Sequence, residues 1–203
     1  MWEDRLFRTR IAGREIDLAF RGRCGGMVFL ALDAYRAGVA IATPEPVGLP
    51  QRSSALARQI MRRQVDSIGT GLGTNLLRFA SMSYRPRGGP VGTAATTGRN
   101  LGDVLAALFA GNPVPLGLIA RNPFAGIGLN HQVLAVGGER DERMLRVRVY
   151  DPNHPRRDDV VLEIEWGGVG PVREFVGGTL RNEWAGLFVE RYAPRKVPTS
   201  LIR

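Results

Sequence analysis

Residues 131–151 read HQVLAVGGERDERMLRVRVYD, and this stretch decides the fold that the sequence predicts. From Leu145 to Tyr150, apolar and other side chains alternate at every second position, which is typical of a β-strand with one buried face. The apolar run 131–136 indicates a second strand, and the glycines and charged residues between the two runs indicate a turn. The stretch therefore predicts an antiparallel hairpin with one apolar face.

A histidine and an aspartate lie at the open end of this hairpin. If the turn is centred near Asp141, His131 lies opposite Asp151, and both fall on the apolar face of their strands. Opposed side chains of an antiparallel pair lie within about 5 Å of each other. A register shifted by two residues places Asn153 or Val149 opposite His131 instead. The first register predicts a His–Asp contact at one end of an apolar sheet face.

The rest of the chain divides into a helical half and a strand-rich half. Loose alternation over residues 2–20 suits a peripheral strand or hairpin. Helical spacing and capping residues predict helices at about 24–37, after Ser53, at 75–82 and after Asn100, with an exposed loop at 85–99. Short apolar runs predict further strands at 115–120, 160–164 and 187–192. Helices followed by an antiparallel sheet indicate one α+β domain over 1–203, helical at about 21–111 and sheet at about 112–195.

The composition excludes several classes of protein. With 203 residues, of which 44% are hydrophobic and 23% charged, the chain is long and apolar enough to bury a core, so wholesale disorder is excluded. A single cysteine rules out an intramolecular disulfide and any multi-cysteine zinc or iron–sulfur site. Cys24, His131, His154 and Asp151 are suitable metal ligands, but the set lacks a tight ligand pair such as CxxC or HxxxH. We therefore expect no metal and no cofactor.

The charge is strongly positive, at +9, and Lys196 is the single lysine among 28 basic residues. Clustered arginines would indicate nucleic-acid binding, but these arginines are scattered along the chain, which argues against that partner. The N-terminus has no apolar stretch behind a basic start, and no window is long and apolar enough to span a membrane. A cytoplasmic location is the default expectation, with signal-independent export left open. The oligomeric state is not predicted.

Cys24 is the only side chain in the sequence with the intrinsic reactivity of a strong nucleophile. Its expected place is the first turn of a helix, where the backbone dipole and a nearby histidinium favour the thiolate. Gly25 and Gly26 leave room for a substrate carbonyl, and the Cys24 amide can stabilise the oxyanion. Asp151 on one ring nitrogen of His131 leaves the other nitrogen free to exchange a proton with the thiol.

Three short motifs resemble the papain-like cysteine peptidase superfamily, in the style of bacterial papain-like proteins similar to bacteriocin-leader-processing peptidases. The motifs are Cys24-Gly25-Gly26-Met27, Asn130-His131-Gln132-Val133-Leu134 and Tyr150-Asp151-Pro152-Asn153. The resemblance covers roughly residues 18–165. It implies a papain-like fold in which an N-terminal helical half carries the nucleophile and packs on a C-terminal antiparallel sheet. It also implies that Cys24 is the nucleophile, His131 the general base and acid, and Asp151 the orienting group.

The sequence departs from that family at the oxyanion hole. Papain-like enzymes usually carry a glutamine six residues before the cysteine, where this chain has Leu18, beside Asp17. Gln132 and Gln51 are the candidates to replace it, and we count Gly25, Gln132 and Asn153 as oxyanion or orienting support.

The residues predict a cysteine-dependent acyl hydrolase, a peptidase or amidase, that acts on a peptide or amide through a thioester. Two alternatives use the same fold: an acyltransferase, if an amine or thiol resolves the thioester, and a catalytically silent binding domain, which the missing glutamine favours. A third alternative, from a different class, is an arginine-rich nucleic-acid binder.

Overall fold

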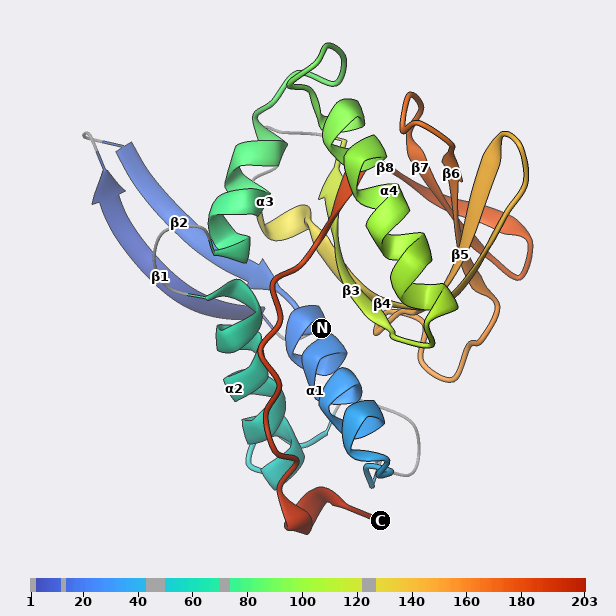
Figure 1. Ribbon diagram of the computed structural model, residues 1–203. Coiled ribbons are helices and arrows are strands. Elements are labelled where there is room, and N and C mark those ends of the chain that lie inside the picture. The colour runs from blue at the N-terminus through green and yellow to red at the C-terminus, as the bar shows by residue number, and fades with distance from the viewer. Residues whose placement is uncertain (1–2, 12–13, 43–49, 70–73, 122–126) are drawn as a thin grey trace.

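The computed structural model describes residues 3–11, 14–42, 50–69, 74–121 and 127–203, and for 3–11, 14–21 and 127 it describes the backbone alone. Its centre is a six-stranded antiparallel barrel (Figure 1). The strands are β3 (Val114–Ala120), β4 (His131–Arg140), β5 (Met144–Tyr150), β6 (Val160–Glu165), β7 (Val172–Val176) and β8 (Thr179–Val189). Each strand pairs with the next, and β3 also pairs with β8, which closes the barrel.

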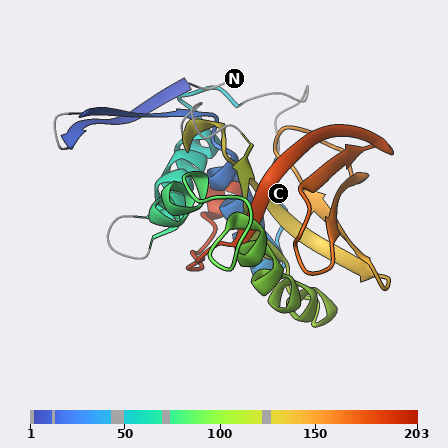
Figure 2. The ribbon, with the colours of Figure 1, turned by 90° about the horizontal axis from the view of Figure 1, so that it is seen from above.

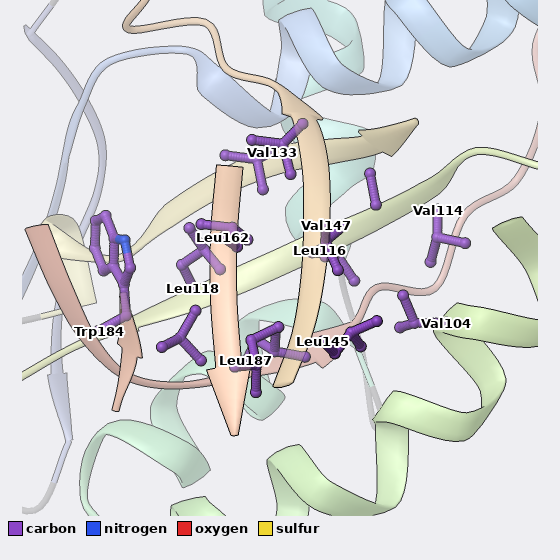
Figure 3. Close-up of a cluster of buried hydrophobic side chains, with 14 of the residues drawn as sticks. Val104, Val114, Leu116, Leu118, Val133, Leu145, Val147, Leu162, Trp184 and Leu187 are labelled. Carbon is purple, nitrogen blue, oxygen red and sulfur yellow. The ribbon is translucent and has the colours of Figure 1, made fainter. Parts of the chain in front are cut away.

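The apolar face predicted from the alternation in β5 forms part of the barrel core. Leu145, Val147 and Val149 are buried, and they pack with inward-facing residues of the other strands (Figure 3). Helix α4 (Thr93–Phe109) lies across the barrel and adds Leu101 and Val104 to the same cluster. A closed barrel of this size is filled by its side chains, so this interior is a packed core.

Three helices and a hairpin lie on one side of the molecule, and strands β5, β6 and β7 of the barrel lie on the other (Figures 1 and 2). The hairpin is formed by β1 (Glu3–Ile11) and β2 (Arg14–Arg21), and it leads directly into α1 (Cys24–Ala37). Helix α2 (Ala55–Ile68) packs along α1, and α3 (Asn75–Ser83) follows it.

The last part of the chain ties these helices to the barrel. After β8 the chain runs along α1 and α2 and reaches a short 3-10 turn, η3 (Thr199–Leu201) (Figure 1). A bridge between Ile41 and Ile202 joins this end of the chain to the segment that follows α1. A second 3-10 turn, η2 (Ile127–Leu129), precedes β4. No helix in the described ranges combines the length and apolar character that a membrane crossing requires.

The expected fold class is wrong in its architecture. We expected a papain-like arrangement, with a helical half packed on an antiparallel sheet of about five strands, whereas the strands close into a six-stranded barrel. Two local errors contributed. Residues 172–176 form a strand, β7, that the sequence reading left out, and the last strand lies at 179–189 instead of 187–192. Closure itself depends on pairing between β3 and β8, which are distant in sequence.

The helix predictions were more accurate than the sheet prediction. The helices expected at 24–37 and 75–82 are α1 and α3, and of the strand or hairpin expected within 2–20 the structure has the hairpin, β1–β2. Ser54, next to the expected Ser53, caps α2, because its hydroxyl accepts a hydrogen bond from the amide of Ala57 at 3.1 Å.

The expected loop at 85–99 and the expected cap at Asn100 need correction. Residues 84–91 are exposed, but α4 already begins at Thr93. Asn100 lies inside that helix, donates to the carbonyl oxygen of Thr96 at 2.6 Å and accepts from the amide of Val189 at 3.1 Å. Its side chain therefore connects α4 to β8. In the sequence, an asparagine that makes such a tertiary contact looks the same as one that caps a helix.

Candidate active site

Cys24 is the first residue of α1, as the sequence predicts, and its side chain is partly buried. The preceding residue, Arg23, is the N-cap, and its guanidinium donates to the carbonyl oxygen of Ala57 in α2 at 3.1 Å. The amide of Gly26 donates to Gln64 Oε1 at 2.8 Å. Two contacts with α2 thus fix the helix end that carries the thiol, and the amides there point toward the N-terminal side of the helix.

Gly25 and Gly26 are required by close packing. A Cβ on Gly26 would collide with the backbone carbonyl of Ile60 in α2. A Cβ on Gly25 would collide with the side chains of Gln132 and Ser67. The two glycines therefore let α1 approach α2 and β4 closely, and this approach places Cys24.

Replacing Gly26 by alanine is expected to lower the free energy of unfolding by about 1–3 kcal/mol, because backbone atoms of α2 must move to admit the methyl group. Gly102→Ala is the matched control: Gly102 is exposed, lies inside α4, and a Cβ there meets no atom within 4 Å. That change should raise stability by up to about 1 kcal/mol. Urea unfolding followed by circular dichroism measures both. Equal effects of the two substitutions would contradict the packing argument.

His131 and Asp151 meet, as predicted, but through a shifted register. The ladder pairs Leu134 with Tyr150, and a bulge follows at residue 136. Extending that register places position 153 opposite His131, which is the two-residue shift considered above. His131 Nε2 lies 2.7 Å from Asp151 Oδ1 and 3.3 Å from Asn153 Nδ2, so both residues of the turn reach the imidazole.

The turn that follows β5 orients the carboxylate. The amide of Asn153 donates to Asp151 Oδ1 at 2.7 Å, and the amide of His154 donates to the Asp151 carbonyl oxygen at 3.0 Å. Side chains of His131 and Asp151 are 7% and 1% exposed. The carboxylate is therefore held against Nε2 away from solvent, which leaves Nδ1 for the thiol.

Electrostatics couple the imidazole to the carboxylate and to the thiol. Burial disfavours the imidazolium, but hydrogen bonds to Asp151 and to Cys24, with the negative charges of both, outweigh it and raise the pKa of His131 to about 10. Burial also disfavours the Asp151 carboxylate, but the hydrogen bond and charge of His131 hold the pKa of Asp151 below its usual value. The arrangement favours the imidazolium form of His131 beside the Asp151 carboxylate.

Trp184 and Glu174 complete the surroundings of this pair, and the sequence reading missed their place in it. The Trp184 ring stacks on the His131 ring, with centroids 5.8 Å apart, and its Nε1 donates to Glu174 Oε2 at 2.8 Å. Trp184 also lines a cavity of about 650 Å³, together with Leu129 and Arg121. Both residues come from the far strands of the barrel, and no local motif marks them.

Of the candidates for the missing glutamine, Gln132 is the one that the structure places beside Cys24. Gln132 is buried, and the Cys24 Sγ lies 4.0 Å from its Oε1. Gln51 is exposed, in the segment before α2. Asp17 and Leu18 lie in β2, where the side chains fall outside the described part of the chain.

The described residues contain one cluster with metal-binding side chains, and it differs from the set considered in the sequence. Asp151, His154 and Glu174 each offer one ligand atom, and these atoms lie within 4.8 Å of one another. His154 is partly buried, with its Nε2 3.5 Å from Glu174 Oε1. Cys24 and His131, which we had grouped with them, are outside this cluster.

Comparison of the chain with protein-family models, with curated proteins and with solved structures gives no match.

Proposed function

We propose that the protein is a cysteine-dependent acyl hydrolase that acts on a peptide or amide bond. The observation that carries this proposal is the meeting of the chain's single thiol, at a helix N-terminus, with a buried His131–Asp151 pair from the other half of the chain. A thiol at a helix N-terminus and a buried His–Asp pair are each common in proteins. Together they form a nucleophile, a base and an orienting group in hydrogen-bonding order.

In the acylation step, the Cys24 thiolate attacks the substrate carbonyl carbon, and a C–S bond forms as the carbonyl electrons move to oxygen. The amide dipoles at the start of α1 favour this oxyanion. The intermediate collapses when the carbon–nitrogen bond breaks, and the His131 imidazolium gives its proton to the departing amine. The products of this half-reaction are a thioester on Cys24 and a neutral imidazole.

In the second step, the neutral His131 takes a proton from water, and the hydroxide formed attacks the thioester carbonyl. The carbon–sulfur bond then breaks, the carboxylic acid leaves, and thiolate and imidazolium are restored. Asp151 stays ionised throughout and holds the ring, because its carboxylate is bound by both the ring and the Asn153 amide.

The cavity beside Trp184 is the proposed place for the acyl side of the substrate. Its wall includes Leu180 and Leu129 as apolar surface, with Arg121 and Glu183 joined in an ion pair at the rim. Trp184 lines this cavity and stacks on the His131 ring, so it connects the cavity wall with the proposed base.

The proposal is tested with p-nitrophenyl acetate, an activated acyl ester that does not require knowledge of the natural substrate. The wild-type chain is expected to release nitrophenol in a burst and to gain one acetyl group on Cys24, observed by mass spectrometry of the intact protein. Cys24→Ala is expected to lose both signals, since the chain has no other thiol. Acetylation of the alanine variant to the same extent would overturn the assignment.

Two further outcomes distinguish the alternatives. If the acetyl group persists on Cys24 in water but is transferred to a small amine or thiol much faster in the folded chain than in urea, the site is an acyltransferase. If Cys24 is not acetylated and reacts with iodoacetamide like an ordinary surface thiol, the proposed activity is wrong and a binding role remains. A library of fluorogenic peptides then identifies which amide substrates the hydrolase accepts.

A further inference from the structure

The turn that holds Asp151 also carries His154, and both residues lie close to Glu174 on β7. Asp151 and His154 are separated by two residues, and the amide of His154 donates to the Asp151 carbonyl oxygen at 3.0 Å, which closes the turn. Glu174 is buried, at 4% exposure. One carboxylate oxygen of each acid and one imidazole nitrogen of His154 lie within 4.8 Å of one another. Two acids and an imidazole from two separate segments therefore share one small volume.

The spacing of these atoms suits a tetrahedral metal ion. Zinc binds imidazole nitrogen and carboxylate oxygen at about 2.0–2.2 Å, so two ligand atoms on a tetrahedral zinc ion lie about 3.4 Å apart. His154 Nε2 lies 3.5 Å from Glu174 Oε1. These two atoms already have the separation of zinc ligands, and a small movement of the turn brings the Asp151 oxygen to the same distance.

One carboxylate oxygen of Asp151 has no partner. Its Oδ1 lies 2.7 Å from His131 Nε2 and accepts from the amide of Asn153 at 2.7 Å. Its Oδ2 is buried and has no hydrogen-bond partner among the described residues. A carboxylate oxygen that is removed from water without a partner is costly, and a bound ion or water is a common reason for such a group. Oδ2 is therefore the oxygen that Asp151 has available for an ion.

The other two side chains also keep one ligand atom each for an ion. Glu174 Oε2 accepts from Trp184 Nε1 at 2.8 Å, which leaves Oε1 as the oxygen that faces His154. The imidazole of His154 contacts Glu174 through Nε2, and a neutral imidazole offers the lone pair of that nitrogen to a metal. The side chain of His154 is 31% exposed, so an ion can reach this position from solvent.

We propose that Asp151, His154 and Glu174 form a Zn²⁺ site, with Asp151 Oδ2, His154 Nε2 and Glu174 Oε1 as the protein ligands and a water molecule as the fourth. The imidazole selects Zn²⁺ over Mg²⁺ and Ca²⁺, which prefer oxygen ligands. The bound ion joins the turn that orients His131 to strand β7. The proposal does not depend on the activity of Cys24.

This site differs from the one that the sequence argued against. The expectation of no metal rested on a set that lacked a tight ligand pair, and that set included Cys24 and His131. The third ligand of the proposed site, Glu174, lies on a strand that the sequence reading left out. Only the pairing of β7 within the barrel places it beside the turn.

The test is equilibrium binding of Zn²⁺, measured by isothermal titration calorimetry at pH 7.5 on the full chain without a histidine tag. Cys24→Ala serves as the reference protein, because a thiolate next to His131 can bind zinc by itself. We expect the reference to bind one Zn²⁺ per chain and to bind Mg²⁺ about 100-fold more weakly. Thermal unfolding gives a second measurement, since Zn²⁺ should raise the Tm of the reference.

Two ligand variants and one control are added to the reference protein. His154→Ala is expected to weaken Zn²⁺ binding about 100-fold, because even changes outside a ligand set cost about 10–100-fold in affinity. Glu174→Gln should have a similar effect, although its amide oxygen can still accept from Trp184 Nε1. Glu163→Gln, the same change on β6 and outside the cluster, should leave Zn²⁺ binding unchanged.

The proposal is overturned if the reference binds no Zn²⁺ or if the His154→Ala variant binds it equally well. Equal affinity for Mg²⁺ and Zn²⁺ also overturns it, because the imidazole would then contribute nothing. Circular dichroism checks the fold of each variant. His154 is partly exposed, so its replacement by alanine tests the site even if Glu174→Gln does not fold.

Discussion

Replacing His131 by glutamine is expected to slow the alkylation of Cys24 by iodoacetamide about 10²-fold at pH 6. A thiol with the ordinary pKa of about 8.5 is roughly 0.3% thiolate at that pH, whereas a thiol paired with an imidazolium is largely ionised. Glutamine keeps a polar group near Asp151 but supplies no positive charge. Hydrolysis of an acyl substrate should fall further, by about 10²–10⁴-fold, because the proton donor and acceptor is also lost.

The pH dependence of this difference follows from the raised pKa of His131. The imidazolium is present below about pH 10 and is lost as the pH rises through that value, so the pair is intact over the whole neutral range. A thiol without such a partner ionises only above about pH 8. The ratio of the two alkylation rates should therefore be largest at pH 6 and shrink steadily toward pH 9.

Alkylation in concentrated urea is the control for this experiment. The unfolded wild type and the unfolded variant should react at the same rate, since the pair exists only in the folded chain. A wild type that reacts at pH 6 no faster than it does in urea would contradict the activation of Cys24, whatever its behaviour toward acyl substrates.

The contrast between the hairpin and the barrel shows what the sequence could predict. The His131–Asp151 contact was predictable because two strands joined by a short turn have few registers, and burial alternation restricts them further. The exact register was not: Arg140 pairs with Leu145, so the turn is centred later than near Asp141, and the bulge at residue 136 changes the pairing by one residue, which leaves position 153 opposite His131. Barrel closure depends on pairing between β3 and β8, for which the sequence contains no local signal.

The site shows the same division between local and distant contacts. Cys24 was placed correctly at the start of a helix because glycines, helical spacing and a terminating Gly38 are local signals. Trp184, Glu174 and Glu190 reach the site from β8, from β7 and from the residue after β8, so only the folded barrel assigns them a place beside His131 or Gln132. Their contribution is to bury the polar groups of the site.

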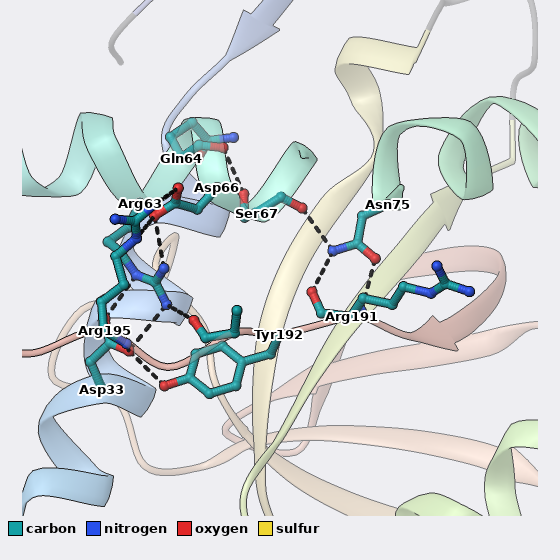
Figure 4. Close-up of polar contacts among 10 residues, drawn as sticks. Asp33, Arg63, Gln64, Asp66, Ser67, Asn75, Arg191, Tyr192 and Arg195 are labelled. Carbon is teal, nitrogen blue, oxygen red and sulfur yellow. Dashed lines mark hydrogen bonds and ion pairs between the residues drawn. The ribbon is translucent and has the colours of Figure 1, made fainter. Parts of the chain in front are cut away.

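Replacing Arg63 by methionine is expected to lower the free energy of unfolding by about 3–5 kcal/mol, with a fall in Tm of about 10 °C. Arg63 is fully buried, and its guanidinium lies 2.8 Å from Asp33 Oδ2 in α1 and 2.8 Å from Asp66 Oδ2 in α2 (Figure 4). It also donates to the carbonyl oxygen of Ala193 in the C-terminal segment at 3.0 Å. Methionine fills similar volume but leaves the buried Asp33 carboxylate without its cation, which is the costly part of the change.

Arg62→Met on the same helix is the control, because Arg62 is exposed and a surface substitution should change stability by about 0.5 kcal/mol or less. Thermal unfolding measures both variants, and equal effects would contradict the role assigned to the buried pair.

A second readout links this pair to the active site. Asp33 also accepts hydrogen bonds from the Tyr192 hydroxyl and the Arg195 amide, so it anchors the segment that begins at Glu190. Loss of Arg63 should loosen that segment, which limited proteolysis detects as cleavage after Arg191 or Arg195, before the barrel unfolds.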